Sequence, residues 1–364
     1  MLSRILKRSA VASVTAALVA AAVPIDATAA TAPTDRRRGT HAAQWQASQL
    51  TKGRIHNAQY DFDDWGLTVD TAIMLAADRT QRESIKRVGV AIENNYFESY
   101  VTFGGDKFAG PMAKTLLAAD VLNQPVRSFG GRNLRKQVLR LVADRGEGFE
   151  VGRLRDSGAT DYSNTFTQAY GVLSLARTGG VRQSVVNYLK KQQCRVGYFR
   201  LEETRGQNCN QADGRVDIDS TALAIQALVA ARSSGAKVGG LRIKEAARWL
   251  LKMQRRNGSF GGGVSTAGSN SNSTGLAAQA LALTNHSRAQ HRAADWVAGL
   301  QITPRRAGDG PAARDIGAIA YNKAALRDAL TTGIQRDERD QFRRATPMAF
   351  YALVPKSFAT ISAP

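Results

Sequence analysis

Two aspartates, Asp217 and Asp219, stand one residue apart in the stretch VDIDSTALAIQALVAA, directly before a nearly unbroken apolar run. Two carboxyl groups held close together can keep one of them protonated near neutral pH, which is what a general acid requires. The same residues can simply begin a helix, because side-chain oxygens there accept hydrogen bonds from free backbone N–H groups and an acidic residue suits the helix dipole. The sequence therefore offers a catalytic acid and a helix start as alternatives.

The apolar run after Asp219 is one of three similar stretches. They align without gaps at their cores, and they start at Ser163, Asp219 and Asn272, with Thr165, Thr221 and Thr274 in register. Each begins with polar residues that suit a helix start and continues with apolar residues in nearly all directions. A helix that is apolar on most sides is buried on most sides, so these stretches predict inner helices.

Helices of a second kind are expected between the inner ones. In VRQSVVNYLKKQ (181–192) and IKEAARWLLKMQ (243–254), apolar residues recur three and four positions apart, and polar residues, including Lys and Arg, fill the remaining face. Buried and half-buried helices thus alternate along the chain in about six pairs, while strand signals are weak. A closed ring with buried helices inside and amphipathic helices outside satisfies both patterns. We therefore predict an all-α fold, an α/α toroid (α6/α6 barrel), over residues 56–360.

The links between these helices carry a recurring pattern. Two sets of residues have the same spacing, and each is followed two positions later by Phe: Tyr188, Gln193 and Gly197, and Trp249, Gln254 and Gly258. Trp296 and Gln301 repeat the first half. The pattern resembles the QW repeat of the prenyltransferase and squalene cyclase (terpenoid cyclase) superfamily. The resemblance implies an α/α toroid in which each Gln hydrogen-bonds the start of a neighbouring helix while the aromatic side chain covers the turn.

The stretch DIDSTA resembles the DVDDTA motif of squalene–hopene cyclases and, more loosely, the DxDD motif of other class II terpene cyclases. This resemblance implies that Asp219 is the proton donor and Asp217 its support. Ser220 replaces the third aspartate of the motif, which weakens the carboxylate cluster, and a similar helix start, Asp70-Thr71-Ala72, occurs without a full cluster. Aromatic residues that would stabilise a carbocation are also few, at 7%. We therefore favour the helix start for Asp219.

Protein prenyltransferases, the other enzymes of this superfamily, hold zinc with an Asp, a Cys two residues on and a His one repeat later. Asp217 matches the first position, but Asp219 stands at the cysteine and Asn272 or Ser273 near the histidine. Two of the three ligands are thus missing. We expect no metal site and no cofactor.

Polar segments precede several predicted inner helices and should meet at one end of the ring. There we expect a ligand-binding rim formed by Asp61, Asp63, Asp64, Asp161, Asn164 and Asn272. Backbone N–H groups and carboxylates on such a rim can bind a small molecule or a glycan. Glycoside hydrolases also share the toroid shape, and their chemistry needs two carboxylates across a cleft, for which Glu202, Glu203, Asp217 and Asp219 are candidates.

The first residues indicate export. Basic residues precede an apolar run that ends in a small-residue cleavage pattern, which predicts a secretory signal peptide over residues 1–29. A flexible basic tail is expected over residues 30–55. No second apolar run follows the first, so we expect no stable membrane insertion. We expect a secreted protein, and in that compartment Cys194 and Cys209 predict a disulfide.

Lys and Arg outnumber Asp and Glu by 50 to 30, which gives a formal net charge of +20. This excess predicts attraction to anionic polymers of a cell envelope, whereas the scattered basic positions and the expected export disfavour nucleic acid. The function we favour from the sequence is a non-catalytic binding or interaction module with a small or polymeric ligand at the rim. A class II terpene-cyclase-like enzyme and a carbohydrate-active enzyme are the alternatives.

Overall fold

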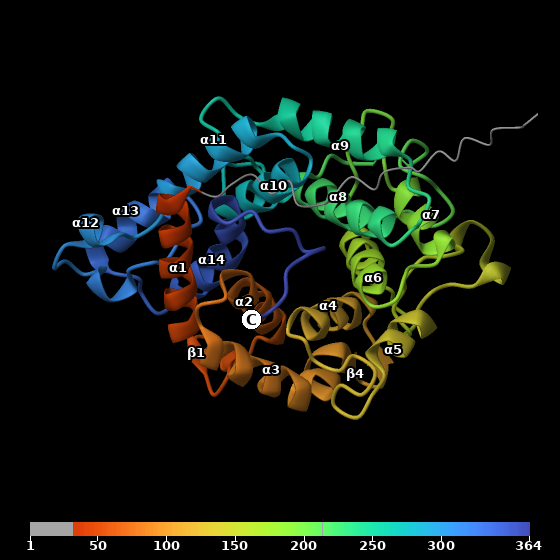
Figure 1. Ribbon diagram of the computed structural model, residues 1–364, viewed down its shortest axis with the longest axis horizontal. Coiled ribbons are helices and arrows are strands. Elements are labelled where there is room, and N and C mark those ends of the chain that lie inside the picture. The colour runs from red at the N-terminus through yellow and green to blue at the C-terminus, as the bar shows by residue number, and fades with distance from the viewer. Residues whose placement is uncertain (1–31, 213) are drawn as a thin grey trace, which may run out of the picture.

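The computed structural model describes residues 32–212 and 214–364, and their helices form two concentric rings (Figure 1). The inner ring consists of α2 (Trp65–Asp78), α4 (Ala109–Val121), α6 (Thr165–Arg177), α8 (Ile218–Ser233), α10 (Ser271–Leu283) and α14 (Arg339–Leu353). The outer ring consists of α1 (Pro33–Ser48), α3 (Arg82–Tyr96), α5 (Leu134–Arg140), α7 (Gln183–Lys191), α9 (Gly240–Met253) and α11 (Ser287–Ala298). Helix α14 packs against α2 and α1, which closes the ring. The predicted α/α toroid is confirmed.

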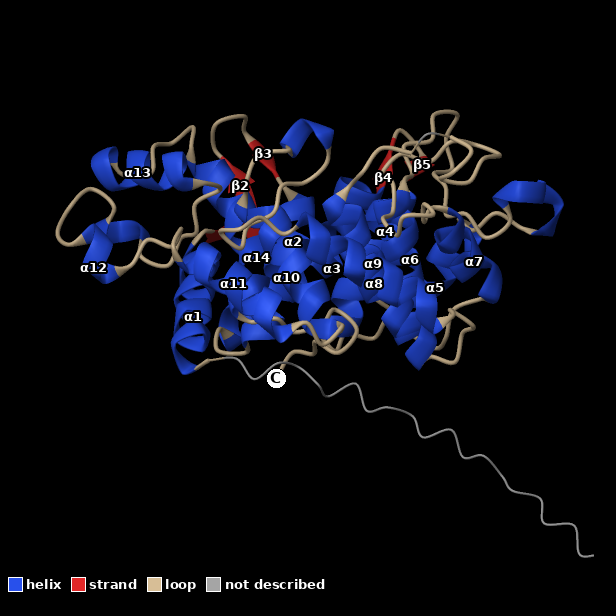
Figure 2. Ribbon diagram, turned by 90° about the horizontal axis from the view of Figure 1, so that it is seen from above, coloured by secondary structure: helices blue, strands red, loops and turns tan. Residues whose placement is uncertain are grey.

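Short strands connect the helices at one end of the ring. Strands β1 (Leu50–Thr51), β2 (Arg54–Asn57) and β3 (Phe62–Asp63) form an antiparallel sheet, and β4 (Thr102–Phe103) pairs with β5 (Asp106–Lys107) in a hairpin. Both lie at the end opposite the C-terminus (Figure 2), which we call the hairpin end. Strand β3 leads into α2 and β5 into α4, so the inner helices begin at this end. Two further helices, α12 (Pro304–Ala307) and α13 (Lys323–Thr332), lie between α11 and α14.

Small side chains let the inner helices pack closely. In α8, residues 220–231 are all buried, and many of them are alanine. Where α10 meets α14, a Cβ on Gly275 would lie 2.0 Å from the carbonyl oxygen of Met348. Because two non-bonded heavy atoms cannot approach so closely, any larger residue at position 275 would force these two helices apart.

Three glutamines tie the connecting turns to the outer ring. The side-chain amide of each donates to a carbonyl oxygen of its own turn and to one near the start of the next outer helix. The pairs are Gly197 (3.0 Å) and Arg242 (2.9 Å) for Gln193, Gly258 (3.0 Å) and Ala289 (2.7 Å) for Gln254, and Gly317 (3.1 Å) and Arg38 (2.9 Å) for Gln301. The bond from Gln301 reaches α1, so the repeated contact also closes the outer ring.

Replacing Gln254 with Ala is expected to lower the free energy of unfolding by about 1–3 kcal/mol, because two largely enclosed carbonyl oxygens lose their donor. Chemical denaturation measures this change. The control is Gln341→Ala on the exposed face of α14, for which we expect a change of no more than about 0.5 kcal/mol. Equal effects of the two substitutions would show that the contact of Gln254 adds nothing to stability.

A second repeated contact joins each turn to an inner helix. A backbone N–H of the turn donates to a side chain one turn into the helix, in the pairs Phe199–Thr221 (2.9 Å), Phe260–Thr274 (3.0 Å) and Leu154–Gln168 (2.8 Å). Gln168, Thr221 and Thr274 lie at equal intervals of 53 residues (221 − 168 and 274 − 221). The sequence alignment placed Thr165 in register with Thr221 and Thr274, but Gln168, three residues later, makes this contact, because α6 starts at Thr165 itself.

The last residues, 354–364, lie across the end of the ring opposite the hairpin end (Figure 1). Arg177 of α6 donates to the carbonyl oxygens of Phe358 and Ile361, each at 2.9 Å. The N–H of Ala363 donates to the carbonyl oxygen of Val121 in α4 at 2.7 Å, and Gln279 of α10 donates to that of Lys356 at 2.6 Å. This C-terminal segment therefore connects three inner helices.

The expected flexible tail over residues 30–55 is wrong for the part that the structure describes. Residues 33–48 form α1, and β1 and the first half of β2 follow. Ala42, Ala43 and Trp45 are buried, and the Trp45 ring N–H donates to Asp315 at 2.9 Å. The toroid therefore begins near residue 33. The predicted signal peptide lies outside the described residues.

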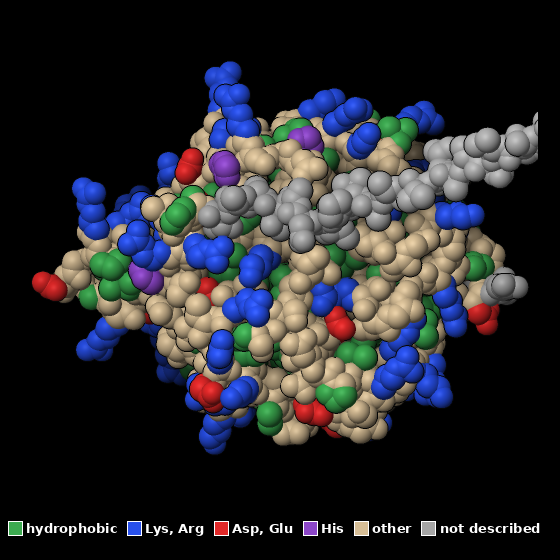
Figure 3. Space-filling model, in the orientation of Figure 1, with side chains coloured by type: hydrophobic (Ala, Val, Ile, Leu, Met, Phe, Trp, Pro, Cys, Tyr) green, Lys and Arg blue, Asp and Glu red, His purple; other side chains and the backbone are tan. Residues whose placement is uncertain are grey.

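Basic side chains are spread over the end of the ring that carries the C-terminal segment, rather than gathered in one patch (Figure 3). This distribution agrees with the scatter of Lys and Arg along the sequence. Among the helices of the described part of the chain, none is long and apolar enough to cross a membrane.

Candidate functional site

The two aspartates of the opening motif have different roles at the start of α8. Asp217 is the residue before the helix, and its Oδ1 accepts a hydrogen bond from the N–H of Ser220 at 2.6 Å. Asp219 lies in the first turn and its carboxyl makes no such capping contact; instead it is hydrogen-bonded by the side chain of Ser273, at the start of α10. Asp217 is thus the N-terminal cap of α8, and Asp219 remains the candidate for the general acid.

Asp219 lies on a pocket at the hairpin end, between the starts of α6, α8 and α10. The pocket has a volume of about 640 Å³, and both aspartates line it. Phe166, Leu201, Val216 and Val264 contribute apolar surface, and Glu202, Thr204, Arg215 and Thr266 contribute polar groups. Glu202 and Arg215 are exposed, so the pocket opens to solvent. Its size suits a ligand of a few rings.

Burial makes Asp219 a weak acid near neutral pH. Removal from water, reinforced by the neighbouring carboxylate of Asp217, raises the pKa of Asp219 to about 7, and the hydrogen bond from Ser273 only partly opposes this. Its Oδ1 is buried and has no hydrogen-bond partner among the described residues. Burial also raises the pKa of Asp217, against the hydrogen bonds from Ser220. A carboxyl group that is protonated up to neutral pH can donate a proton to a ligand.

Asn272 holds the corresponding position in the next repeat. Helix α10 starts at Ser271, and its cap is Asn270, whose side chain accepts from the N–H of Ser273 at 2.8 Å. Asn272 therefore follows its cap by two residues, as Asp219 follows Asp217. Its Oδ1 is buried without a partner in the part of the chain that the structure describes. Asn272 is not among the residues that line the pocket.

The other expected rim residues before α2 are engaged in local contacts. Asp64 caps α2 through the N–H of Leu67 at 2.8 Å, and it also pairs with Arg344 of α14. Asp63 pairs with Arg54 and lies 2.9 Å from His56. Asp61 is exposed on a turn, where its φ is +52°. These three aspartates lie at the hairpin end as expected, but none of them lines the pocket of Asp219.

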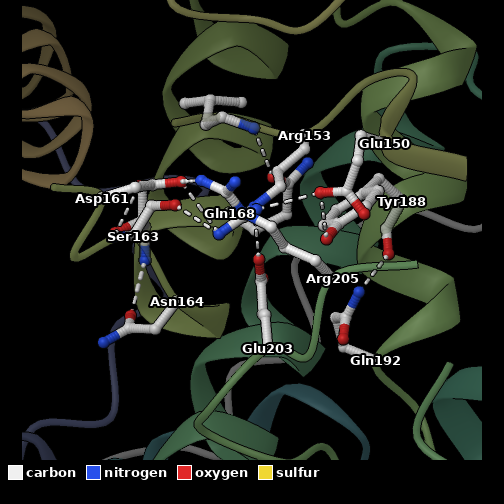
Figure 4. A network of polar contacts seen from close by, with 12 residues as sticks. Glu150, Arg153, Asp161, Ser163, Asn164, Gln168, Tyr188, Gln192, Glu203 and Arg205 are labelled. Carbon is white, nitrogen blue, oxygen red and sulfur yellow. Dashed lines mark hydrogen bonds and ion pairs between the residues drawn. The ribbon is translucent and has the colours of Figure 1, made fainter. Parts of the chain in front are cut away.

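Asp161 and Asn164 precede α6 and also serve the local structure. Asn164 caps α6 by accepting from the N–H groups of Phe166 (3.0 Å) and Thr167 (3.3 Å). Asp161 lies 3.1 Å from Arg153 in a buried ionic network (Figure 4). Arg153 also contacts Glu150 (2.9 Å) and Glu203 (3.1 Å), so one guanidinium serves three carboxylates from separate segments.

This network fixes one wall of the pocket. Glu203 is enclosed, and burial raises its pKa to about 7 although Arg153 and Arg200 lower it. Its neighbours Arg200, Leu201, Glu202 and Thr204 line the pocket. The predicted disulfide between Cys194 and Cys209 is present and spans the same segment. Of the four carboxylates considered for hydrolysis, Glu202, Asp217 and Asp219 therefore share one pocket, while Glu203 lies beneath its wall.

A second polar cluster, which sequence reasoning missed, lies among the inner helices. Lys114 of α4 lies 2.7 Å from Asp70 of α2 and donates to the carbonyl oxygen of Gly66 at 3.2 Å. Burial lowers the pKa of Lys114, but Asp70 together with Tyr100 and Tyr170 raises it by more, so the pKa lies above its usual range. The ammonium group therefore stays charged. Burial raises the pKa of Tyr170 on α6 and of Tyr351 on α14; the carboxylate of Asp70 adds to both effects, while Lys114 opposes the first.

The described residues contain no group of three or more His, Cys, Asp or Glu side chains that could hold a metal ion.

Comparison with solved structures defines the class of the fold. The type II terpene cyclase MstE from Scytonema matches with a TM-score of 0.61 at 15% identity, over 90% of this chain and 99% of that one. An α-1,6-mannanase from Salegentibacter matches with 0.56 at 11% identity, over 88% and 99%. A protein from Actinoplanes matches with 0.53 at 17% identity, over 90% and 99%. No protein-family model and no curated protein sequence matches the chain.

The chain has the α/α toroid fold that a terpene cyclase and a mannanase share. The resemblance inferred from its repeats is therefore confirmed at the level of the fold. At these identities the likeness extends to the fold alone, and the function must be argued from the pocket.

Proposed function

We propose that the protein is a carbohydrate-active enzyme that cleaves glycosidic bonds, with Asp219 as the general acid. The observation that carries this proposal is the position of Asp219: a carboxyl group with a raised pKa and an unpaired buried oxygen, on the wall of an open pocket. A glycosidic oxygen needs protonation as its bond breaks, and enzymes supply it from a carboxylic acid whose pKa is raised by burial.

Glycoside hydrolysis needs a second carboxylate, and the pocket offers Glu202. Asp217 already accepts the hydrogen bond from Ser220 that starts α8, whereas Glu202 is exposed on another segment of the same wall. In the proposed mechanism Asp219 donates its proton to the leaving oxygen. Glu202 either activates a water molecule or attacks the sugar directly. Water reaches the pocket through its exposed side.

A terpene cyclase reaction fits the pocket less well. Protonation of an alkene needs a strong acid, but burial makes Asp219 a weaker acid than an ordinary aspartate. Carbocations also need aromatic faces and protection from water, whereas Phe166 is the one aromatic residue among the pocket's lining residues. Among the inner helices, the charged ammonium of Lys114 would repel a carbocation. These features favour glycoside hydrolysis over terpene cyclisation as the reaction in this pocket.

Two structural neighbours supply the substrates for a direct test. The solved mannanase is an inactive variant bound to α-1,6-mannotriose, and variants of MstE were solved with geranylgeranyl dihydroxybenzoate. The protein should be incubated with α-mannan, β-glucans and chitin, and separately with this prenylated substrate. Release of reducing ends by the first group supports the proposal. Cyclisation of the prenylated substrate, or no turnover of any glycan, would refute it.

The pH profile of glycan turnover tests the role of the acid. Because Asp219 must carry its proton, the rate is expected to fall about tenfold per pH unit above a pH of about 7. A profile that keeps rising through this range would exclude an acid of raised pKa. Tight glycan binding without turnover would instead support the non-catalytic module that the sequence favoured.

A further inference from the structure

The exposed aromatic side chains of the protein are confined to the hairpin end. All four that occur among the described residues lie in segments that lead into inner helices, namely Tyr60, Phe62, Phe103 and Tyr162, whose exposed fractions are 70%, 43%, 82% and 69%. Tyr60 and Phe62 precede α2, Phe103 precedes α4 and Tyr162 precedes α6. The starts of α8 and α10 follow, with exposed Val216 and Val264 on the pocket itself. Five consecutive inner helices are thus each preceded by exposed apolar side chains.

The local structure holds these rings in the solvent. Phe103 lies beside a two-residue turn, Gly104 and Gly105, whose φ values of +60° and +90° suit glycine. Tyr162 packs against Phe108 with ring centroids 6.4 Å apart. Asp156 joins the two segments, since it accepts from the N–H of Ala109 at 2.7 Å and from that of Tyr162 at 3.0 Å. An exposed ring on a fixed backbone loses little conformational freedom on binding, so it is preorganised for contact with a ligand.

Contacts between neighbouring segments also connect Tyr162 to the pocket. Asp161, its neighbour in sequence, pairs with Arg153, which pairs with Glu203 beside the pocket-lining residues. In addition, the N–H of Thr165 donates to the carbonyl oxygen of Leu201 at 3.0 Å. The aromatic residues and the pocket thus all lie at the hairpin end, and the segment of Tyr162 is joined directly to the pocket wall.

We infer that this surface, defined by Phe103 and Tyr162 and extending to Tyr60 and Phe62, binds an extended neutral polysaccharide that leads into the Asp219 pocket. This inference rests on the proposed function for the class of ligand. Exposed carboxylates such as those of Asp61 and Asp106 lie in the same segments as the aromatic rings, whereas a lipid or protein partner favours a contiguous apolar patch. Sugar rings present apolar C–H faces to aromatic rings and hydroxyl groups to carboxylates, which this combination matches. A binding track makes the preferred substrate a polymer.

Binding is tested with native gel electrophoresis in the presence of soluble α-mannan, β-1,3-glucan or hydroxyethyl cellulose. The whole protein carries Asp219→Asn so that the polymer is not consumed. We expect at least one of these polymers to retard it, and Phe103→Ala with Tyr162→Ala to weaken that binding about tenfold. The matched control is Val90→Ala with Leu241→Ala, two exposed apolar residues on α3 and α9, with an expected change below about twofold.

The outcomes separate this inference from the proposed function. Retardation that survives about 0.5 M NaCl excludes simple attraction by the net charge of +20. Equal binding by the aromatic and control variants, no retardation by any of the three polymers, or aromatic-dependent binding to phosphatidylcholine vesicles would overturn the binding track. If retardation depends on the aromatic residues but the wild-type protein turns over no glycan, the binding track is supported and the proposed enzymatic function is refuted.

Discussion

Replacing Asp219 with Asn is expected to lower glycan turnover by about 10²–10⁴-fold, the usual contribution of a general acid. Asn keeps the shape of the side chain but cannot donate a carboxyl proton. The fold should tolerate it, because Asn272 occupies the corresponding position of α10. Turnover is measured on the glycan that the wild-type protein cleaves. Retention of more than about a tenth of the rate would remove Asp219 from the chemistry.

The same substitution should also stabilise the protein at high pH. The pKa of Asp219 is higher in the folded state, at about 7, than the ordinary value of 3.8, so ionisation costs the folded state free energy as pH rises between these values. At about pH 8 we expect Asp219→Asn to raise the free energy of unfolding by about 2–4 kcal/mol, and the gain to shrink progressively toward pH 4.

Urea denaturation at several pH values measures this gain. The control is Asp295→Asn on the exposed face of α11, which removes the same charge without relieving a buried carboxyl group. The control should shift stability by no more than about 0.5 kcal/mol at every pH. Loss of activity without any gain at high pH would mean that Asp219 is ionised in the resting protein, and its assignment as the acid would fail.

Replacing Arg153 with Met is expected to destabilise the protein by about 3–5 kcal/mol at pH 8. The substitution removes the partner of Glu150, Asp161 and Glu203, and it leaves the enclosed carboxylate of Glu203 with Arg200 as its nearby cation. Loss of a cation raises the pKa of Glu203 further above its usual range. The penalty is therefore greatest above that pKa and decreases as pH falls and Glu203 takes up a proton.

Arg205 supplies a matched control for Arg153. Its guanidinium lies 3.8 Å from the same Asp161, but its side chain is 72% exposed. Arg205→Met should cost no more than about 1 kcal/mol, as for other surface ion pairs. Thermal or urea denaturation of both variants tests the difference. A similar small cost for both substitutions would show that water screens the Arg153 network. It would contradict the inference that this network fixes one wall of the pocket.

The sequence predicts the parts of this fold that depend on local spacing. Apolar residues on nearly all sides of α8 and α10 identified the inner ring, and the Gln193 and Gln254 pattern identified the turns that join the repeats. Asp217 and Asp219 were recognised because they are neighbours in the chain. Each of these signals is contained in one short stretch of sequence, so no knowledge of distant contacts was needed.

The remaining features depend on distant residues and leave no such pattern. Arg153 and Glu203 are 50 residues apart, and each alone resembles an ordinary surface charge. Lys114 is an isolated basic residue in an apolar helix, and only the ring brings Asp70 to it. Helix α1 was taken for a flexible tail because Arg36, Arg37 and Arg38 dominate its composition. Its burial comes from packing against α14, at the other end of the chain.

The packing of α1 against α14 also limits how such a protein can change its length. An open array of repeats can gain or lose one unit at its end, because each unit touches only its neighbours. In the described part of the chain, the first and last helices, α1 and α14, are neighbours. Deleting one helix pair would therefore leave a gap in the closed ring, and duplicating one would leave a pair with no place in it. New length can enter only outside the ring, as in the stretch between α11 and α14 that carries α12 and α13.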